Sequence, residues 1–201
     1  MNFKKLQAMQ AKLDEAILSE KEPMTAEERF DKTLVALSIE IAEVANTAEH
    51  FKFWKDNKGK VDSKRFTYNG LTDFSDSQLW TDENSGVSNY TFAQAHKLTL
   101  VEECSDALHF ILSLTNQVDF EIKGIGTHFD IAGDAESLEK NFIFLNYLIG
   151  SAEFKHFHLD LEMIIDVFFI YINQLDISQQ ELEQAYYDKN KVNYERLENG
   201  Y

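Results

Sequence analysis

The sequence has one cysteine, one proline and eight glycines among its 201 residues. A single cysteine excludes an intrachain disulfide, and this favours a reducing compartment. Strong helix breakers are nearly absent, while Leu, Ala, Glu and Lys recur in long runs. The composition therefore predicts an all-α fold, and the length is that of a single domain.

The sequence also lacks an apolar run long enough to cross a membrane, and its first residues lack the apolar segment of a signal peptide. We therefore expect a cytoplasmic protein with no membrane partner. Positive charge is scarce, because 19 Lys and Arg face 35 Asp and Glu, for a formal net charge of −16. Such a charge argues against a nucleic acid polymer as partner. A single nucleotide can still bind where a divalent metal and a few basic residues reverse the field locally.

Hydrophobic periodicity and capping signals predict a helical bundle of about six helices in one domain, residues 1–201. The predicted helices cover residues 3–20, 25–57, 91–119, 135–157, 159–175 and 178–194. Between the second and third helices the helical period fails, and Gly, Asp, Ser and Asn gather around isolated aromatics. We expect a long irregular insertion over residues 57–90, in which a short hairpin around Asn69-Gly70 stays an open alternative.

Two pairs of acids lie beside wide apolar stripes of the predicted helices. Glu40 and Glu43 are three residues apart in the second helix, and Glu103 and Asp106 have the same spacing in the third. This spacing places both members of a pair on one side of a helix. Clustered carboxylates repel one another unless a cation neutralises them, and Mg²⁺ prefers such oxygen ligands and shares them with phosphates. The pairs therefore predict a Mg²⁺ site between the two helices.

Other interpretations stay open at this stage. In so acidic a chain each pair is also common on a solvated helix face, which would suit a non-catalytic acidic interaction protein whose aromatic insertion binds a partner. A di-iron carboxylate bundle is a further alternative, because Asp106 and His109, like Glu153 and His156, place an acid and a histidine at positions i and i+3. His109 can equally be a structural histidine at the edge of the core.

Four spaced segments resemble the dimeric all-α dUTPases, a group of the MazG-related all-α nucleoside triphosphate pyrophosphohydrolases. The segments are Leu6–Asp14, the Glu40 and Glu43 pair with Phe51–Lys55 after it, Glu103–His109, and Tyr187–Tyr201. Residues 57–97 and 124–155 are essentially unmatched. Two positions depart from the pattern, since Asp14 stands where Asn is frequent and Leu197 where Gln is frequent. An Asp cannot donate the hydrogen bond that an amide donates.

The resemblance implies a homodimer that hydrolyses dUTP, and also dUDP, to dUMP by metal-activated water, with Mg²⁺ as cofactor. It implies that Glu40, Glu43, Glu103 and Asp106 hold the metal and that Glu43 orients or deprotonates the water. The substrate-binding residues implied are Gln10, Asp14, Trp54, Lys55, His109, Lys189, Asn193, Arg196 and Tyr201. Of these, Lys55, Lys189, Arg196 and Tyr201 would contact phosphates. A broader dNTP or dCTP pyrophosphohydrolase stays an alternative, because some relatives accept dCTP.

Overall fold

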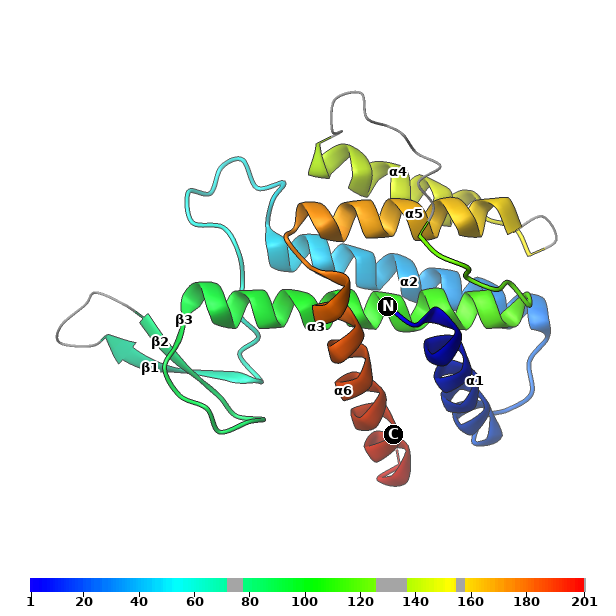
Figure 1. Cartoon of the computed structure of the whole chain (residues 1–201), viewed down its shortest axis with the longest axis horizontal. Helices are drawn as coiled ribbons and strands as arrows, with labels where there is room; N and C mark the ends of the chain where they lie inside the picture. Colours follow the sequence, from blue (N-terminus) through cyan, green and yellow to red (C-terminus); the bar gives the residue numbers. More distant parts are fainter. Residues whose placement is uncertain (72–77, 126–136, 155–157, 201) are drawn as a thin grey trace.

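The computed structural model describes residues 1–71, 78–125, 137–154 and 158–200. Within them it contains six helices and one three-stranded sheet (Figure 1). The helices are α1 (Phe3–Ser19), α2 (Ala26–Ala48), α3 (Phe92–Gln117), α4 (Leu138–Ser151), α5 (His158–Gln174) and α6 (Gln179–Glu198). The strands are β1 (Phe66–Leu71), β2 (Gln78–Asp82) and β3 (Tyr90–Thr91). The predicted all-α class is confirmed, with a small sheet added.

Helix α3 lies at the centre of the fold and contacts α1, α2, α5 and α6 (Figure 1). Fourteen of its 26 residues are buried, among them the apolar Leu108, Ile111 and Leu112. Because α3 is covered on several sides, some of its polar residues are buried as well, including Ser105 and His109. These polar side chains need partners inside the fold rather than in water.

The helix starts agree with the capping signals in the sequence. The side chains of Thr25, Thr91 and Ser178 each accept a hydrogen bond from the backbone N–H three residues later. At Thr91 and Ser178 the capping box is complete, because the side chain of the third residue also bonds back to the cap. Local side-chain chemistry therefore fixes where α2, α3 and α6 begin.

The end of the second helix differs from the prediction, because α2 stops at Ala48 rather than near residue 57. Glu49 follows in the left-handed region, with a φ of 54°. Its buried carboxylate accepts hydrogen bonds from Nζ of Lys52 at 2.8 Å, from Nζ of Lys55, and from the backbone N–H of Gly59 at 3.1 Å. Helical periodicity cannot foresee this loop, in which the chain leaves the axis of α2 and folds around one acid.

The insertion predicted as irregular over residues 57–90 contains the antiparallel sheet, ordered β1-β2-β3. Phe66 lies opposite Asp82, and the register shifts between Tyr68 and Gly70. The alternative of a short hairpin around Asn69-Gly70 agrees with the antiparallel pairing of β1 and β2, but these two residues form an irregularity inside β1, where Gly70 has a φ of 96°. The sheet lies beside the first turns of α3 (Figure 1).

The ends of the other helices differ from the predicted ends by fewer residues. Helix α4 covers less than the predicted range 135–157, and α6 continues past residue 194 to Glu198. Residues 135–136 and 155–157 of the predicted fourth helix lie outside the described residues. Among the helices of the described residues, none is both long enough and apolar enough to cross a lipid bilayer.

Candidate functional site

Three of the four predicted metal ligands meet where α2 packs against α3. Carboxylate oxygens of Glu40, Glu103 and Asp106 lie within 4.8 Å of one another, and all three residues are half-buried. Glu43 is exposed one turn further along α2 and lies outside this group of three. Its negative charge nevertheless acts on both Glu40 and Glu103. We call Glu40, Glu103 and Asp106 the acidic cluster.

Burial and mutual repulsion make the acidic cluster hard to ionise fully. Burial, followed by the charge of Asp106, raises the pKa of Glu40 to about 7. The same two causes raise the pKa of Glu103 to about 7, and burial also raises the pKa of Asp106. A nearby cation would relieve this repulsion. Three carboxylate oxygens at this spacing form the hard donor set that suits Mg²⁺.

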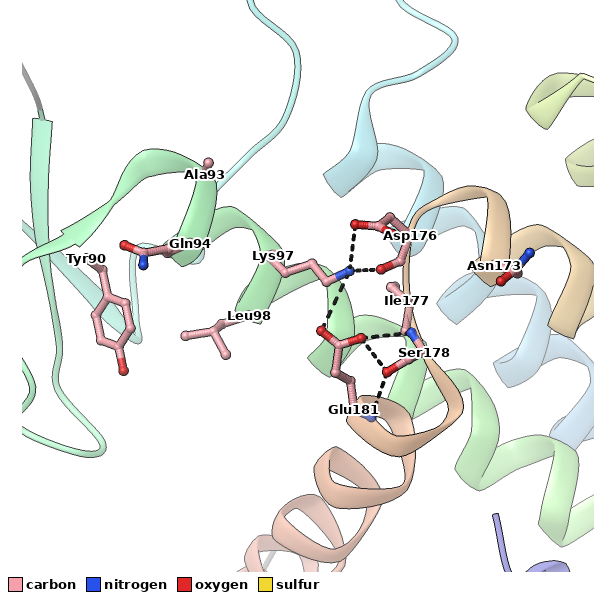
Figure 2. Close-up of a pocket in the computed structure, with 10 residues that line it drawn as sticks. All are labelled: Tyr90, Ala93, Gln94, Lys97, Leu98, Asn173, Asp176, Ile177, Ser178 and Glu181. Atoms are coloured by element: carbon pink, nitrogen blue, oxygen red, sulfur yellow. Dashed lines mark hydrogen bonds and ion pairs between the residues drawn. The ribbon is translucent and has the colours of Figure 1, made fainter.

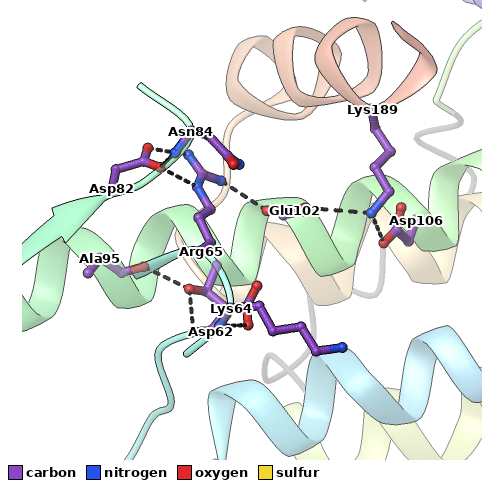
Figure 3. Close-up of polar contacts among 10 residues, drawn as sticks. Asp62, Lys64, Arg65, Asp82, Asn84, Ala95, Glu102, Asp106 and Lys189 are labelled. Atoms are coloured by element: carbon purple, nitrogen blue, oxygen red, sulfur yellow. Dashed lines mark hydrogen bonds and ion pairs between the residues drawn. The ribbon is translucent and has the colours of Figure 1, made fainter. Parts of the chain in front are cut away.

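Helix α6 supplies a positive charge at the rim of the cluster. Nζ of Lys189 lies 2.7 Å from Oδ2 of Asp106 and 3.5 Å from Oε1 of Glu102 (Figure 3). Burial works against the charge of Lys189, but the two carboxylates override it, and its pKa is raised. The charge of Arg196 on the same helix also acts on Asp106. The structure therefore brings Lys189 of the predicted set into contact with the acids, while Arg196 acts on them through its charge alone.

A second group of predicted residues forms a hydrogen-bond network between α1, α3 and α6. Oε1 of Gln10 accepts from Nδ1 of His109 at 2.7 Å and from the hydroxyl of Tyr186 at 3.1 Å. The rings of His109 and Tyr186 are stacked, with centroids 4.2 Å apart. Because a carbonyl oxygen only accepts, His109 carries its ring proton on Nδ1. Burial lowers the pKa of His109 to about 3, so the ring is neutral at pH 7.

Asp14 extends this network by accepting three hydrogen bonds. Its Oδ1 accepts from Nε2 of Gln10 at 2.7 Å, and its Oδ2 accepts from Arg29 at 2.9 Å and from Ser113 at 2.7 Å. Since the carboxylate only accepts, it forces the NH₂ group of Gln10 toward itself and the carbonyl toward His109. Asp14 therefore takes part in the site through Gln10, which it orients.

A comparison with known protein families matches residues 2–73 and 90–201 to the family described as dUTPase. The chain belongs to the all-α dUTPase family. This membership implies a nucleotide pyrophosphohydrolase with dUTP diphosphatase function. The acidic cluster, Lys189 and the Gln10 network all lie in the matched segments, whereas residues 74–89, with β2, lie outside them. A comparison with curated proteins finds no match.

Four buried polar atoms on α3 and α6 of this dUTPase family member have no hydrogen-bond partner among the described residues. They are Oγ of Ser105, Nε2 of His109, Oε1 of Gln117 and Nδ2 of Asn190. Buried polar groups are nearly always paired, so unpaired ones mark places that a polar ligand or water completes. Three of the four lie around the stacked rings of His109 and Tyr186, because Ser105 is one turn before His109 on α3 and Asn190 is one turn after Tyr186 on α6.

Other predicted site residues are not joined to the cluster or the network by any contact within the described residues. Lys55 pairs with Glu49, and Trp54 is 65% exposed and packs on the ring of Phe53 with centroids 5.0 Å apart. Asn193 is half-buried on α6. Tyr201 lies outside the described residues.

Four residues of the site were missed from the sequence, namely Arg65, Glu102, Tyr186 and Asn190. Sequence position offered a signal for three of them. Glu102 adjoins Glu103, Tyr186 precedes Lys189 by three residues on one helix, and Asn190 follows Lys189 directly. Arg65 gave no local signal, because it meets Glu102 across 37 positions.

A pocket of about 720 Å³ lies apart from these groups, between the first turns of α3 and the turn that joins α5 to α6 (Figure 2). Its lining includes Tyr90, Asn173 and Lys97, and Nζ of Lys97 is 3.8 Å from the carboxylate of Glu181. It shares no residue with the acidic cluster or with the Gln10 network. The candidate site that the sequence predicted therefore lies outside this pocket.

Proposed function

We propose that the chain hydrolyses dUTP, and also dUDP, to dUMP with Mg²⁺ as cofactor. The observation that carries this proposal is the acidic cluster with Lys189 at its rim, in a member of the dUTPase family. A triphosphate brings several negative charges, which a divalent ion on the carboxylates and a lysine beside them together neutralise. The strongly acidic chain can bind an anionic nucleotide at such a site.

In this mechanism Glu40, Glu103 and Asp106 would hold the metal, and Glu43 is the carboxylate that orients the attacking water and receives its proton. When bound, Mg²⁺ supplies Lewis-acid stabilisation of the phosphate charge and lowers the pKa of its bound water. The oxygen of the water forms a bond to phosphorus while the bond to the leaving phosphate oxygen breaks. From dUTP the products are dUMP and pyrophosphate, and from dUDP they are dUMP and phosphate.

The basic residues of α6 bind the phosphates in this proposal. Lys189 already lies at the acids, and the charge of Arg196 reaches Asp106. Positive groups held in place before the reaction stabilise the charge that develops on the leaving group. We expect Lys189 and Arg196 to contribute to nucleotide affinity as well as to turnover.

We further propose that His109 selects uracil. Its Nε2 is buried, carries no proton and has no partner among the described residues, so it can accept the N3–H of uracil. Cytosine presents an acceptor at N3, which would face an acceptor on His109. A buried site that hydrogen-bonds one base rejects a base that leaves its polar group unpaired. Asp14 orients Gln10, and Gln10 in turn fixes the tautomer of His109. These two hydrogen bonds therefore set the selectivity for the base.

We also propose a homodimer. Val35 and Ile39 are more than half exposed on α2, as are Ile143 and Tyr147 on α4, and each pair has the i, i+4 spacing of one helix face. The two helices are in contact. Large exposed apolar side chains that recur on the faces of two adjoining helices suit an interface. This surface of α2 and α4 is where we expect a second copy to bind.

Turnover of dUTP in ¹⁸O-labelled water, followed by ³¹P NMR, tests the reaction. We expect dUMP and pyrophosphate as products, formed only with Mg²⁺, and the position of the label identifies which phosphorus is attacked. Release of dUDP and phosphate, or turnover that continues at the same rate in chelator, would contradict the proposal.

A further inference from the structure

Arg65 stands just before β1, at the base of the sheet, and joins two carboxylates. Its Nε and Nη2 lie 3.2 and 2.9 Å from the two oxygens of Asp82, and its Nη1 lies 2.9 Å from Oε2 of Glu102 (Figure 3). The other oxygen of Glu102 is 3.5 Å from Nζ of Lys189, which is 2.7 Å from Asp106. An unbroken series of ion pairs therefore runs from β2 to the acidic cluster.

The guanidinium of Arg65 is fixed on several sides. Asp82 is 2% exposed and binds it with both oxygens, and the guanidinium also lies over the ring of Phe66, 4.9 Å from the centroid. The segment is tied to α3 by the backbone N–H of Asp62, which donates to Oγ1 of Thr99 at 3.1 Å. Arg65 therefore holds Glu102 from a rigid base.

The ammonium group of Lys189, by contrast, lies at the end of a long flexible side chain. Among the described residues its ion-pair partners are Glu102 and Asp106. Without Glu102, the charge of Lys189 would be drawn to Asp106 alone, a carboxylate that we assign to the metal. With Glu102 in place, the ammonium group is shared between two acids at the rim of the cluster. The position of Lys189 thus depends on the position of Glu102.

We propose that Arg65 is a positioning residue, which acts through Glu102 to hold Lys189 at the rim of the acidic cluster for contact with a nucleotide phosphate. The inference rests on the proposed function and deepens it. It assigns a role to the sheet, because Asp82, which holds Arg65, lies in the segment outside the family match. Asp82 and Arg65 touch the reacting groups only through Glu102 and Lys189.

The substitution Glu102→Gln tests this inference, because a purely electrostatic account and a positioning role predict opposite changes in nucleotide affinity. The negative charge of Glu102 near a phosphate site disfavours an anion, so its removal should tighten nucleotide binding if charge is all that matters. If Glu102 positions Lys189, its removal should weaken binding instead. The substitution Glu102→Gln leaves the contact between Arg65 and Asp82 in place and therefore separates the two effects.

The experiment is titration calorimetry of a non-hydrolysable dUTP analogue with Mg²⁺ against the wild type, Glu102→Gln and a control, Glu28→Gln. Glu28 forms an exposed ion pair with Lys32 at 2.7 Å on α2, so the control removes the same charge elsewhere. We expect Kd to rise about three- to fivefold in Glu102→Gln, as for the loss of a partly exposed ion pair, and to stay unchanged in the control. KM for dUTP should rise by a similar factor, with a smaller change in kcat.

The substitution Arg65→Lys completes a double-mutant cycle with Glu102→Gln. Lysine keeps the charge but lacks the planar fork that binds two carboxylates at once. We expect it to raise Kd in the wild-type background and to have no further effect beside Glu102→Gln. Equal effects in both backgrounds, or unchanged binding in Glu102→Gln while the wild type binds, would overturn this inference alone. A wild type that binds no analogue would overturn the proposed function and this inference together.

Discussion

Nδ1 of His109 lies 2.7 Å from Oε1 of Gln10, although the two residues are 99 positions apart in the sequence. The same oxygen accepts the hydroxyl of Tyr186, and the NH₂ group of Gln10 is held by Asp14. This arrangement leaves His109 only one tautomer, with a free acceptor at Nε2. In the proposed function, these hydrogen bonds of Gln10 and Asp14 would therefore set the choice of base through His109.

Replacing Gln10 with leucine should reduce base selectivity. The substitution Gln10→Leu removes the acceptor that orders His109, so we expect the ratio of kcat/KM for dUTP over dCTP to fall about tenfold. Gln7→Leu is the matched control on the same helix, since Gln7 bonds to Thr115 and to the carbonyl of Phe120. An unchanged ratio in Gln10→Leu, or an equal fall in the control, would contradict the role given to His109.

Neutralising Asp106 should abolish most turnover without unfolding the protein. In Asp106→Asn the cluster loses one carboxylate, and we expect the rate of pyrophosphate release to fall about 100- to 1000-fold. The circular dichroism spectrum should stay that of a helical protein. Asp31→Asn, an exposed acid of α2, serves as the control and should keep wild-type activity. An active Asp106→Asn variant would show that the metal is held elsewhere.

The raised pKa of Glu40 has a consequence for stability in the absence of metal. The folded state binds this proton more tightly than the unfolded state, so stability falls as the pH rises from 4.5, the ordinary pKa, through about 7. In chelator, Glu40→Gln should therefore melt at the same temperature as wild type near pH 4 and about 3 °C higher at pH 8. Mg²⁺ should remove this advantage. A gain that does not depend on pH would exclude repulsion as its cause.

The contribution of Glu49 to the stability of the fold should depend on pH in the opposite direction. Burial works against its charge, but Lys52 and Lys55 override burial and lower its pKa to about 2. Its ionised form therefore stabilises the fold above pH 4.5, and this contribution is lost as the pH falls toward 2. Glu49→Gln should lower Tm by about 4 °C at pH 7. The difference from wild type should shrink below pH 4.5, and a constant difference would count against the ion pairs.

The homodimer can be tested on the exposed surface of α2 and α4. Ile39 is 54% exposed, so Ile39→Lys should leave the monomer folded while placing a charge in the proposed interface. Light scattering should give a dimer mass for wild type at micromolar concentration and a monomer mass for the variant. A monomeric wild type would exclude the dimer.

The sequence predicted the acidic cluster because its members are set by local spacing. Glu103 and Asp106 are one turn apart on a helix, and hydrophobic periodicity showed which helix sides are buried. Glu40 follows from the same argument on α2. Periodicity could not tell that Glu43 is exposed, because that depends on how far α3 covers α2.

Other parts of the site depend on contacts between distant residues. Gln10 was assigned by resemblance alone, since its bond to His109 exists only once α1 packs on α3. The pairing of Arg65 with Glu102 needs the sheet, whose two-residue third strand is too short for a periodic signal. Lys55 was assigned to the site by the resemblance. The loop around Glu49 gives it another partner.

Pyrophosphate release from dUTP, dCTP, dTTP, dATP and UTP, each with Mg²⁺ and with chelator, tests the central claim most directly. The proposal predicts release from dUTP with Mg²⁺, far less from dCTP and dATP, whose bases lack the N3–H that His109 would accept, and none in chelator. Equal release from dUTP and dCTP would indicate a broader pyrophosphohydrolase and contradict base selection by His109, while dTTP and UTP show whether the thymine methyl and the 2′-hydroxyl are excluded as well. No release from dUTP, or release unaffected by chelator, would contradict a metal-dependent dUTPase at the acidic cluster.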